Sequence, residues 1–235
     1  MSSTGNDIVA LAAIDKQRTH HSRFYSKILS DAERALFDRL QPVEMPFENF
    51  VWLLWSVKES VYKYLKRTEP GLVFSPIKIG IQCIDPPSGD LVAKLPGNQW
   101  EGGQWGDRDG QWESREAGPG NEFYKGIALF ESRIFYFRSK IHPEYISTVV
   151  NEEENFENIW WGVKSIDRSD YAHQSAVVRA FVLNRLNAVC GDHLQIGKSP
   201  VGYPIVLKDA EEMKIPVSFA HHGRYIAYSF LLANS

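Results

Sequence analysis

Hydrophobic and polar residues are spaced in ways that predict both strands and helices in the first 70 residues. The apolar run at residues 8–11 predicts a buried strand. Ser30 and Glu33 have the spacing of a capping box, which predicts a helix that ends near residue 40. A second helix is predicted to begin at Phe47 and to end before Pro70, because apolar side chains recur every three or four residues. These apolar positions are Phe50, Leu54, Val57, Val61 and Leu65.

Strand patterns dominate the segment from residue 76 to residue 150. Alternation at 76–84 predicts a strand, 91–95 a weaker partner, and 123–137 a hairpin that turns at Glu131-Ser132. Residues 97–122 lack periodicity, which predicts an exposed loop. The tryptophans of this loop either form an edge that binds a partner or hold the loop to the surface, the commoner role. They are Trp100, Trp105 and Trp112.

A second unit is expected to begin near residue 150. The acidic stretch at 152–157 predicts a solvated linker or a helix start rather than a metal site. A helix at 169–189, closed by Gly191, and strands at 204–206 and 217–232 follow. This order predicts an α+β fold, with one unit at residues 1–150 and the other at residues 151–235.

Composition narrows the class of protein. A chain of 235 residues with 43% hydrophobic residues can bury a core, which excludes a disordered polypeptide. The 26 basic and 29 acidic residues argue against a general nucleic-acid binder but leave room for a local phosphate site. Two isolated cysteines exclude a disulfide framework, and no apolar stretch is long enough for a signal peptide or a membrane span. We therefore expect a reduced, cytoplasmic protein.

Two carboxylates and a lysine are candidates for a metal and phosphate site. Asp7 directly precedes the first predicted strand, and Glu59 and Lys63 share one helix face because they are four residues apart. Such carboxylates can hold Mg²⁺, and Lys63 would face the same substrate phosphates. An Asx turn at Asp7 and an ordinary surface ion pair are the alternatives. Carboxylates more than about 7 Å apart could not share one ion with ligand bonds of ~2.1 Å.

A third candidate element lies near the C-terminus, where two histidines precede Gly223 and Arg224. No further His or Cys has a zinc-like spacing, so a metal site is the less natural interpretation. A phosphate site built from His221, Arg224 and backbone amides fits these residue types better. A surface turn with a hydrogen-bonded histidine fits them equally well.

Five short motifs of the chain occur together in one known family. They are Gly5-Asn6-Asp7-Ile8, Arg23-Phe24 with Leu29-Ser30 and Glu33, Trp55 to Lys63, Gly202-Tyr203-Pro204, and Ser218-Phe219-Ala220-His221. The 4′-phosphopantetheinyl transferases carry signatures that read roughly G-x-D-I, R-F with L-S/T-x-x-E, W-x-x-K-E-A-x-x-K, G-K-P and S-x-S-H. The chain therefore resembles this family over about residues 5–67 and 170–230.

The resemblance implies transfer of 4′-phosphopantetheine from coenzyme A to a serine of an apo acyl- or peptidyl-carrier protein, with Mg²⁺. Asp7 and Glu59 would be the metal ligands, and Glu59 or a metal-bound water would take the proton of the serine hydroxyl. Lys63 would stabilise the pyrophosphate or assist that proton transfer, and His221 would contact the 3′-phosphate of coenzyme A. The other expected coenzyme A contacts are Arg179, Lys198 and Arg224.

Three departures from the family pattern bear on this expectation. Val9 stands where long members often have a third metal-binding Glu, so water is expected there. Tyr203 replaces the lysine of G-K-P, for which Lys198 is a possible substitute, and Ala220 replaces the second serine of S-x-S-H. The changes at Tyr203 and Ala220 leave open a non-catalytic relative that binds coenzyme A or a carrier protein. A further alternative is another Mg²⁺-dependent reaction on a nucleotide pyrophosphate.

The order of the motifs also differs from that of long family members, in which two similar α+β halves form one pocket. Those members carry G-K-P and S-x-S-H first, whereas this chain carries D-I and K-E first. The resemblance thus implies a pseudo-dimer with exchanged half order, working as a monomer. The metal-ligand half would be residues 1–150, and the coenzyme A-phosphate half residues 151–235.

Overall fold

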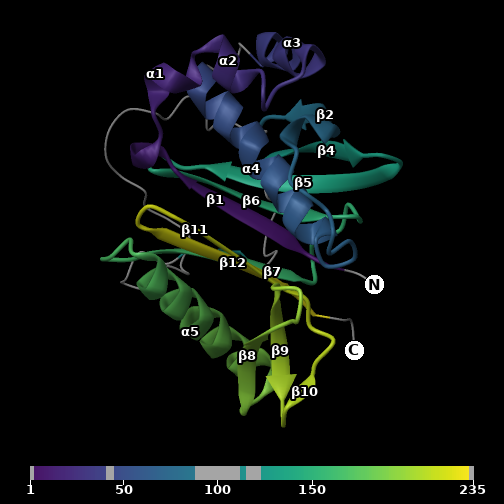
Figure 1. Cartoon of the computed structure of the whole chain (residues 1–235), viewed down its shortest axis with the longest axis vertical. Coiled ribbons are helices and arrows are strands. Elements are labelled where there is room, and N and C mark those ends of the chain that lie inside the picture. Colours follow the sequence, from purple (N-terminus) through teal and green to yellow (C-terminus); the bar gives the residue numbers. More distant parts are fainter. Residues whose placement is uncertain (1–2, 41–44, 88–111, 115–122, 233–235) are drawn as a thin grey trace.

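Helices and strands are mixed along the chain, as the sequence predicts, and the fold is α+β (Figure 1). The computed structural model describes residues 3–40, 45–87, 112–114 and 123–232. The helices are α1 (Lys16–Thr19), α2 (Ser22–Tyr25), α3 (Asp31–Arg39), α4 (Phe47–Leu65) and α5 (Tyr171–Cys190), with 3₁₀ turns η1 (Leu11–Ala13) and η3 (Pro76–Lys78). Within these ranges, no helix has the length and apolar character needed to cross a membrane.

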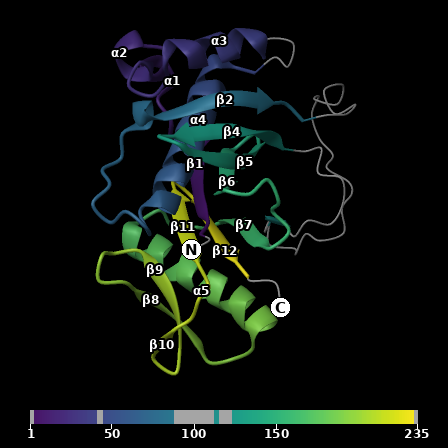
Figure 2. The same ribbon diagram turned by 90° about the vertical axis from the view of Figure 1, so that its right-hand side faces the viewer.

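The first half of the molecule (residues 3–151) is built on a five-stranded antiparallel sheet in the order β1-β6-β5-β4-β2. Its strands are β1 (Gly5–Ala10), β2 (Ile79–Asp85), β4 (Tyr124–Phe130), β5 (Arg133–Ile141) and β6 (Tyr145–Asn151). Helix α4 crosses one face of this sheet and buries an apolar stripe that includes Phe50, Leu54 and Val57. Figure 2 shows α1, α2 and α3 gathered above β2, around the N-terminal end of α4.

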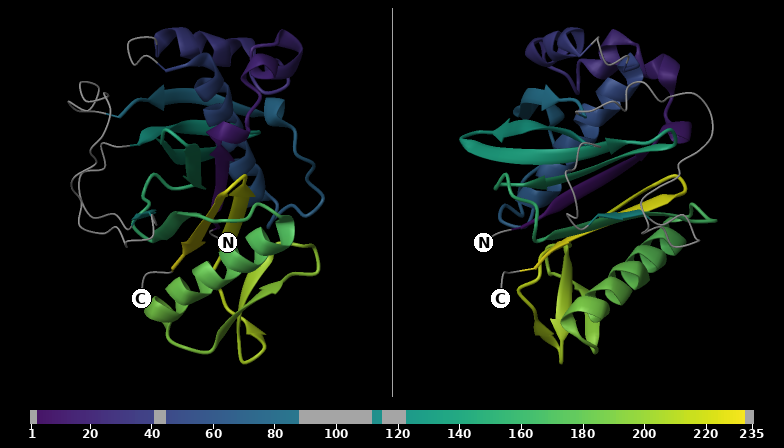
Figure 3. Two further views of the ribbon diagram at one scale, coloured as in Figure 1. Left: turned by 90° about the vertical axis from the view of Figure 1, so that its left-hand side faces the viewer. Right: turned by 180° about the vertical axis from the view of Figure 1, so that it is seen from behind.

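The second half (residues 159–232) contains two smaller antiparallel sheets in the orders β11-β12-β7-β3 and β10-β9-β8. Its strands are β3 (Trp112–Ser114), which comes from the earlier part of the sequence, β7 (Ile159–Ser165), β8 (Leu194–Lys198), β9 (Pro204–Lys208), β10 (Glu211–Glu212), β11 (Val217–His222) and β12 (Tyr225–Leu231). Helix α5 packs Val178, Val182 and Leu186 against this half, on the side that faces away from the first sheet (Figure 3).

The two halves meet where β1 lies beside β11 and β12. The Asn6 amide donates to Ser218 Oγ at 3.3 Å, and the Ala10 amide donates to His222 Nδ1 at 3.0 Å. Between these bonds, Ile8 packs against Ala220 in a small apolar cluster. The edge strand β1 is thereby buried along its whole length.

Most of the long elements agree with the sequence predictions. The helices at 31–39, 47–65 and 171–190 and the hairpin with its turn at Glu131-Ser132 are confirmed. The capping box is present, because Ser30 Oγ accepts from the Glu33 amide while Glu33 Oε2 accepts from the Ser30 amide.

Other predictions were wrong or fall outside the described residues. The segment at 76–78 is a 3₁₀ turn that precedes β2. The stretch at 152–157 is the mostly exposed connection between β6 and β7, so the linker alternative is confirmed and the helix start was wrong. Within this connection, Glu152 accepts from Tyr64 and Arg133. Within the predicted loop at 97–122, residues 112–114 form β3, which pairs antiparallel with β7 of the second half. The predicted strand at 91–95 and the loop tryptophans Trp100 and Trp105 lie outside the described residues.

A buried ion pair between Lys58 and Glu33 connects α4 to α3 and to the five-stranded sheet. Lys58 is fully buried, and its Nζ lies 2.8 Å from the Glu33 carboxylate and donates to the Ile28 carbonyl. Burial lowers the pKa of Lys58, opposed by Glu33. Glu33 also accepts from the Ile81 amide of β2, so one carboxylate joins α3, α4 and the sheet.

Replacing Lys58 by methionine is expected to lower the free energy of unfolding by about 3–5 kcal/mol, because it leaves the Glu33 carboxylate buried without a cation. Urea unfolding of K58M and wild type measures this difference. The double variant K58M/E33Q removes the stranded charge and should recover part of the loss. A K58M variant as stable as wild type would contradict this role for the pair.

Candidate functional site

The candidate site is built where α4 crosses β1. A Cβ atom at Gly5 would lie 2.0 Å from the Ser60 carbonyl oxygen, so the close crossing requires glycine. Asp7 lies two residues further along β1, on the same face of the strand, and therefore meets α4 as well. Asp7 is inside β1, opposite Thr148, so the expected position just before the strand was wrong, and so was the alternative of an Asx turn. The strand starts earlier because the α4 and β11 contacts bury Gly5 and Asn6 too.

Asp7, Glu59 and Lys63 form a compact charged group. Lys63 Nζ lies 2.9 Å from Asp7 Oδ1 and 3.4 Å from Glu59 Oε1. Because both oxygens contact the same nitrogen, their separation cannot exceed the sum of these distances, so the two carboxylates meet the criterion of about 7 Å, which is necessary for sharing one ion. The Asp7 side chain is only 6% exposed, whereas that of Glu59 is 28% exposed. The group therefore has a buried end at Asp7 and an end open to solvent at Glu59.

This group has an excess of negative charge when both carboxylates are ionised, because Asp7 and Glu59 share the single ammonium of Lys63. Burial raises the pKa of Asp7 to about 6; Lys63 opposes this rise and Glu59 adds to it. Burial alone would lower the pKa of Lys63, but Asp7 and Glu59 outweigh it and hold that pKa above its usual value. A second cation at this point would relieve the excess negative charge.

Asp7 Oδ2 supplies an independent sign that a cation fits here. This buried oxygen has no hydrogen-bond partner among the described residues. A hard divalent cation prefers oxygen ligands and keeps waters in its shell, so Asp7 and Glu59 suit Mg²⁺. No cluster of three or more His, Cys, Asp or Glu side chains able to hold a metal occurs in the described ranges. Water or substrate would therefore supply the other ligands.

His221 comes to the same region from the second half. It is half-buried on β11, and its ring lies edge-on to that of Tyr171, the first residue of α5, at 5.4 Å. Burial lowers the pKa of His221, Lys63 lowers it further, and Glu59 acts in the opposite direction. The charges of Lys63 and Glu59 thus influence the pKa of His221. The neighbouring His222 instead accepts from the Ala10 amide and holds the two halves together.

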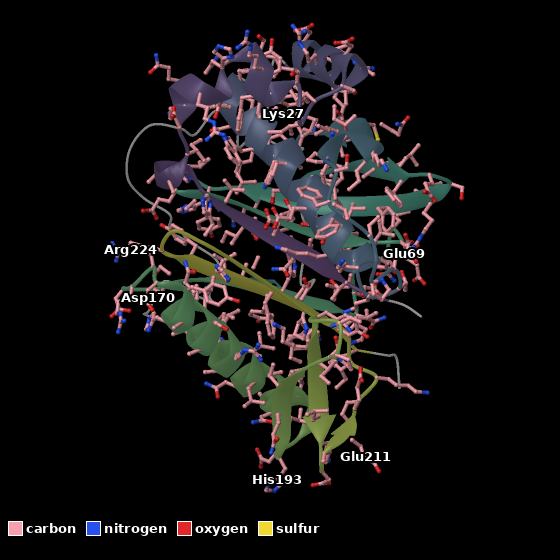
Figure 4. The ribbon with its side chains drawn as sticks, viewed as in Figure 1. Lys27, Glu69, Asp170, His193, Glu211 and Arg224 are labelled. Carbon is pink, nitrogen blue, oxygen red and sulfur yellow. The ribbon has the colours of Figure 1, made fainter. Side chains whose placement is uncertain are left out.

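The other predicted coenzyme A contacts are not joined to this group by hydrogen bonds or ion pairs. Arg179 is half-buried on α5 beside Ser175, and exposed Lys198 lies near Gly202. Arg224 is exposed and donates to the Ile166 carbonyl. Figure 4 shows it at the left edge of the molecule, on the opposite side from Glu69.

Arg67, just beyond α4, makes a contact with the second half that the sequence patterns did not reveal. Its Nη2 donates to the carbonyl oxygens of Pro204 and Val217, and its guanidinium carbon lies 4.7 Å from the centre of the Tyr203 ring. Arg67 and Tyr203 also line a cavity of about 770 Å³. Asp7 and His221 do not line it, so this cavity is separate from the charged group.

A comparison with known protein families bears on this geometry. The family model described as the 4′-phosphopantetheinyl transferase superfamily matches residues 3–113. Over these residues the chain is similar to that superfamily. The match contains the phosphopantetheinyl transferase motifs that carry Asp7, Glu59 and Lys63, and it ends before β4. No curated protein and no solved structure matches the chain significantly.

The raised pKa of Asp7 predicts a pH-dependent stability difference from Asp7→Asn. A carboxyl whose pKa is higher in the folded state than the ordinary 3.8 contributes stability at low pH, and this contribution disappears as the pH rises through about 6. Between pH 4.5 and 7.5, wild type should therefore lose about 2 kcal/mol relative to D7N. Urea unfolding of both proteins without metal at the two pH values measures this change. An equal stability difference at both values would show that Asp7 titrates normally.

Proposed function

We propose that this protein transfers 4′-phosphopantetheine from coenzyme A to a serine of an apo acyl- or peptidyl-carrier protein, with Mg²⁺. One observation carries the proposal. The carboxylates of Asp7 and Glu59, on two different elements, converge on Lys63 Nζ, and a buried Asp7 oxygen has no partner among the described residues. These residues lie within the superfamily match.

Asp7 and Glu59 are the proposed Mg²⁺ ligands. A bound Mg²⁺ ion supplies neutralisation of the charge that develops on the pyrophosphate oxygens. Val9, where a third carboxylate is expected in long members, is buried against the core of the first half. The remaining coordination positions would therefore be filled by water and substrate oxygens.

Glu59 is the proposed base, since it is the more exposed of the two carboxylates and can be reached by an incoming carrier protein. As it takes the proton of the serine hydroxyl, the serine oxygen bonds to the phosphorus that bears the pantetheine. The bond from that phosphorus to the bridging pyrophosphate oxygen breaks, which releases adenosine 3′,5′-bisphosphate. Lys63 stays protonated at neutral pH because its pKa is raised, and it can stabilise the negative charge of the leaving group.

His221 is the proposed contact of the 3′-phosphate, since it lies on β11, the strand of the second half that packs beside β1, and the charges of Lys63 and Glu59 both influence its pKa. A phosphate beside the ring would favour its protonated form. Arg179, Lys198 and Arg224 remain further candidates for coenzyme A binding, to be tested one by one.

We also propose that the two halves are related as a pseudo-dimer and act together as a monomer, with the division near residue 150. Strand order supports this relation. In the first half α4 follows β1, and the sheet order is β1-β6-β5-β4-β2. In the second half α5 follows β7, and β7-β12-β11 and β9-β8 are neighbours in the corresponding order.

The departures that favour a non-catalytic relative have a packing explanation. Ala220 is 3% exposed and packs against Ile8 between the halves, where a serine hydroxyl would need its own hydrogen-bond partner. Tyr203 packs against Arg67. The ion pairs of Asp7 and Glu59 are with Lys63, so neither substitution removes a partner of the proposed metal ligands.

Transfer is tested by incubating the protein with coenzyme A, Mg²⁺ and several apo carrier proteins and following the intact carrier mass. A gain of one phosphopantetheine is expected on at least one carrier, together with loss of the gain in EDTA. Coenzyme A binding without any mass gain would select the non-catalytic alternative. Competition by coenzyme A fragments would expose a different reaction on a nucleotide pyrophosphate.

Glu59→Gln is expected to lower the transfer rate at least about 100-fold, because it removes both the base and a charged metal ligand. Circular dichroism and thermal unfolding should show an intact fold. Glu48→Gln is the matched control, because Glu48 lies on the same helix but pairs with Lys16 away from Asp7. Wild-type rates in E59Q would refute the assigned role.

A further inference from the structure

Arg67 connects the end of α4 to the second half of the molecule. Its Nη2 donates to the carbonyls of Pro204, the first residue of β9, and Val217, the first residue of β11. The Tyr203 ring lies at 4.7 Å from the guanidinium carbon and completes the contact. The guanidinium is thus held by three residues of the second half, through two hydrogen bonds and one contact with an aromatic ring.

These contacts join the two elements that carry the candidate site. Lys63 lies four residues before Arg67, near the end of α4, and Glu59 lies one helical turn before Lys63. On the other side, β11 runs from Val217 to His222 and includes His221. The hydrogen bonds that start on β1, from Asn6 and Ala10, hold β11 against the strand and do not involve α4.

We propose that Arg67 is a positioning residue that sets the spacing between the carboxylates on α4 and His221 on β11. The part of this inference that concerns coenzyme A rests on the proposed function. One substrate must span both elements, with its pyrophosphate near Glu59 and its 3′-phosphate near His221. A fixed spacing preorganises the site for that span and lowers the cost of binding.

An arginine is suited to this role in a way that a lysine is not. The guanidinium is planar and rigid, so it can donate to two carbonyls while it packs against an aromatic ring. Lys66, the adjacent residue, provides the matched control. Its Nζ also donates to two carbonyls, those of Pro70 and Leu72, but both belong to the first half.

Two native cysteines allow the spacing to be measured without transferase activity. Cys83 is on β2 and Cys190 ends α5, so each half carries one free and partly exposed thiol. Nitroxide labels at both thiols report the distance between the halves by pulsed electron paramagnetic resonance. Arg67→Met should broaden the distance distribution, Arg67→Lys should broaden it less, and Lys66→Met should leave it as in wild type.

The same variants are compared in coenzyme A binding and in kinetics. R67M should weaken coenzyme A binding and raise its KM about tenfold, as expected for loss of hydrogen bonds from a charged donor. The kcat and the Mg²⁺ dependence should change less than about threefold, because Asp7, Glu59 and Lys63 all lie in the first half. K66M should leave every one of these values near that of wild type.

An R67M variant with an unbroadened distance distribution, or with the coenzyme A affinity of K66M, would overturn the proposal. If R67M does not fold, R67K decides by the same criterion. A broadened distribution in a protein that transfers nothing would support the positioning role and refute the proposed function. Normal transfer by wild type, together with an unbroadened distance distribution in R67M, would support the proposed function and refute the positioning role of Arg67.

Discussion

The close crossing of α4 over β1 at Gly5 is the constraint on which the rest of the structure depends. Without a side chain at that position the helix backbone rests directly on the strand. The next residue on the same face, Asp7, is then brought within hydrogen-bond distance of Lys63. The opposite face of β1 is left for β11, so one short strand carries both the charged group and the junction of the two halves. The Lys58–Glu33 pair connects the same helix to α3 and, through Ile81, to β2.

Electrostatic imbalance is the property of the site that matters most for function. Burial makes ionisation of Asp7 unfavourable, and its single cationic neighbour is shared with Glu59. In a low-dielectric environment such an excess of negative charge attracts cations strongly. The chain keeps this excess although a neutral residue at Asp7 would relieve it. This cost in stability is typical of functional sites, where charged groups are arranged for a ligand rather than for the fold.

Local patterns predicted the elements whose signals are local. The capping box of Ser30 and Glu33 and the helical spacing from Phe47 to Leu65 needed no knowledge of the rest of the chain, and the pairing of Glu59 with Lys63 follows from the same helix. The role of Arg67 could not be predicted, because its acceptors are backbone carbonyls about 140 residues away. Nor could the patterns distinguish His221 from His222, which point to different neighbours only once β11 lies beside β1. The motifs of the family supplied the long-range association that spacing alone lacked.

The strand β3 has a consequence for how the chain can be divided. Residues 112–114 come from the first half in sequence, yet they pair with β7 and extend the sheet of the second half. A cut in the connection between β6 and β7 would therefore leave two fragments that still share a sheet. Expressed separately, the C-terminal fragment would expose the edge of β7 that β3 now covers, and such an edge is prone to pair with other chains. The two fragments are thus interlocked and cannot be exchanged as independent modules.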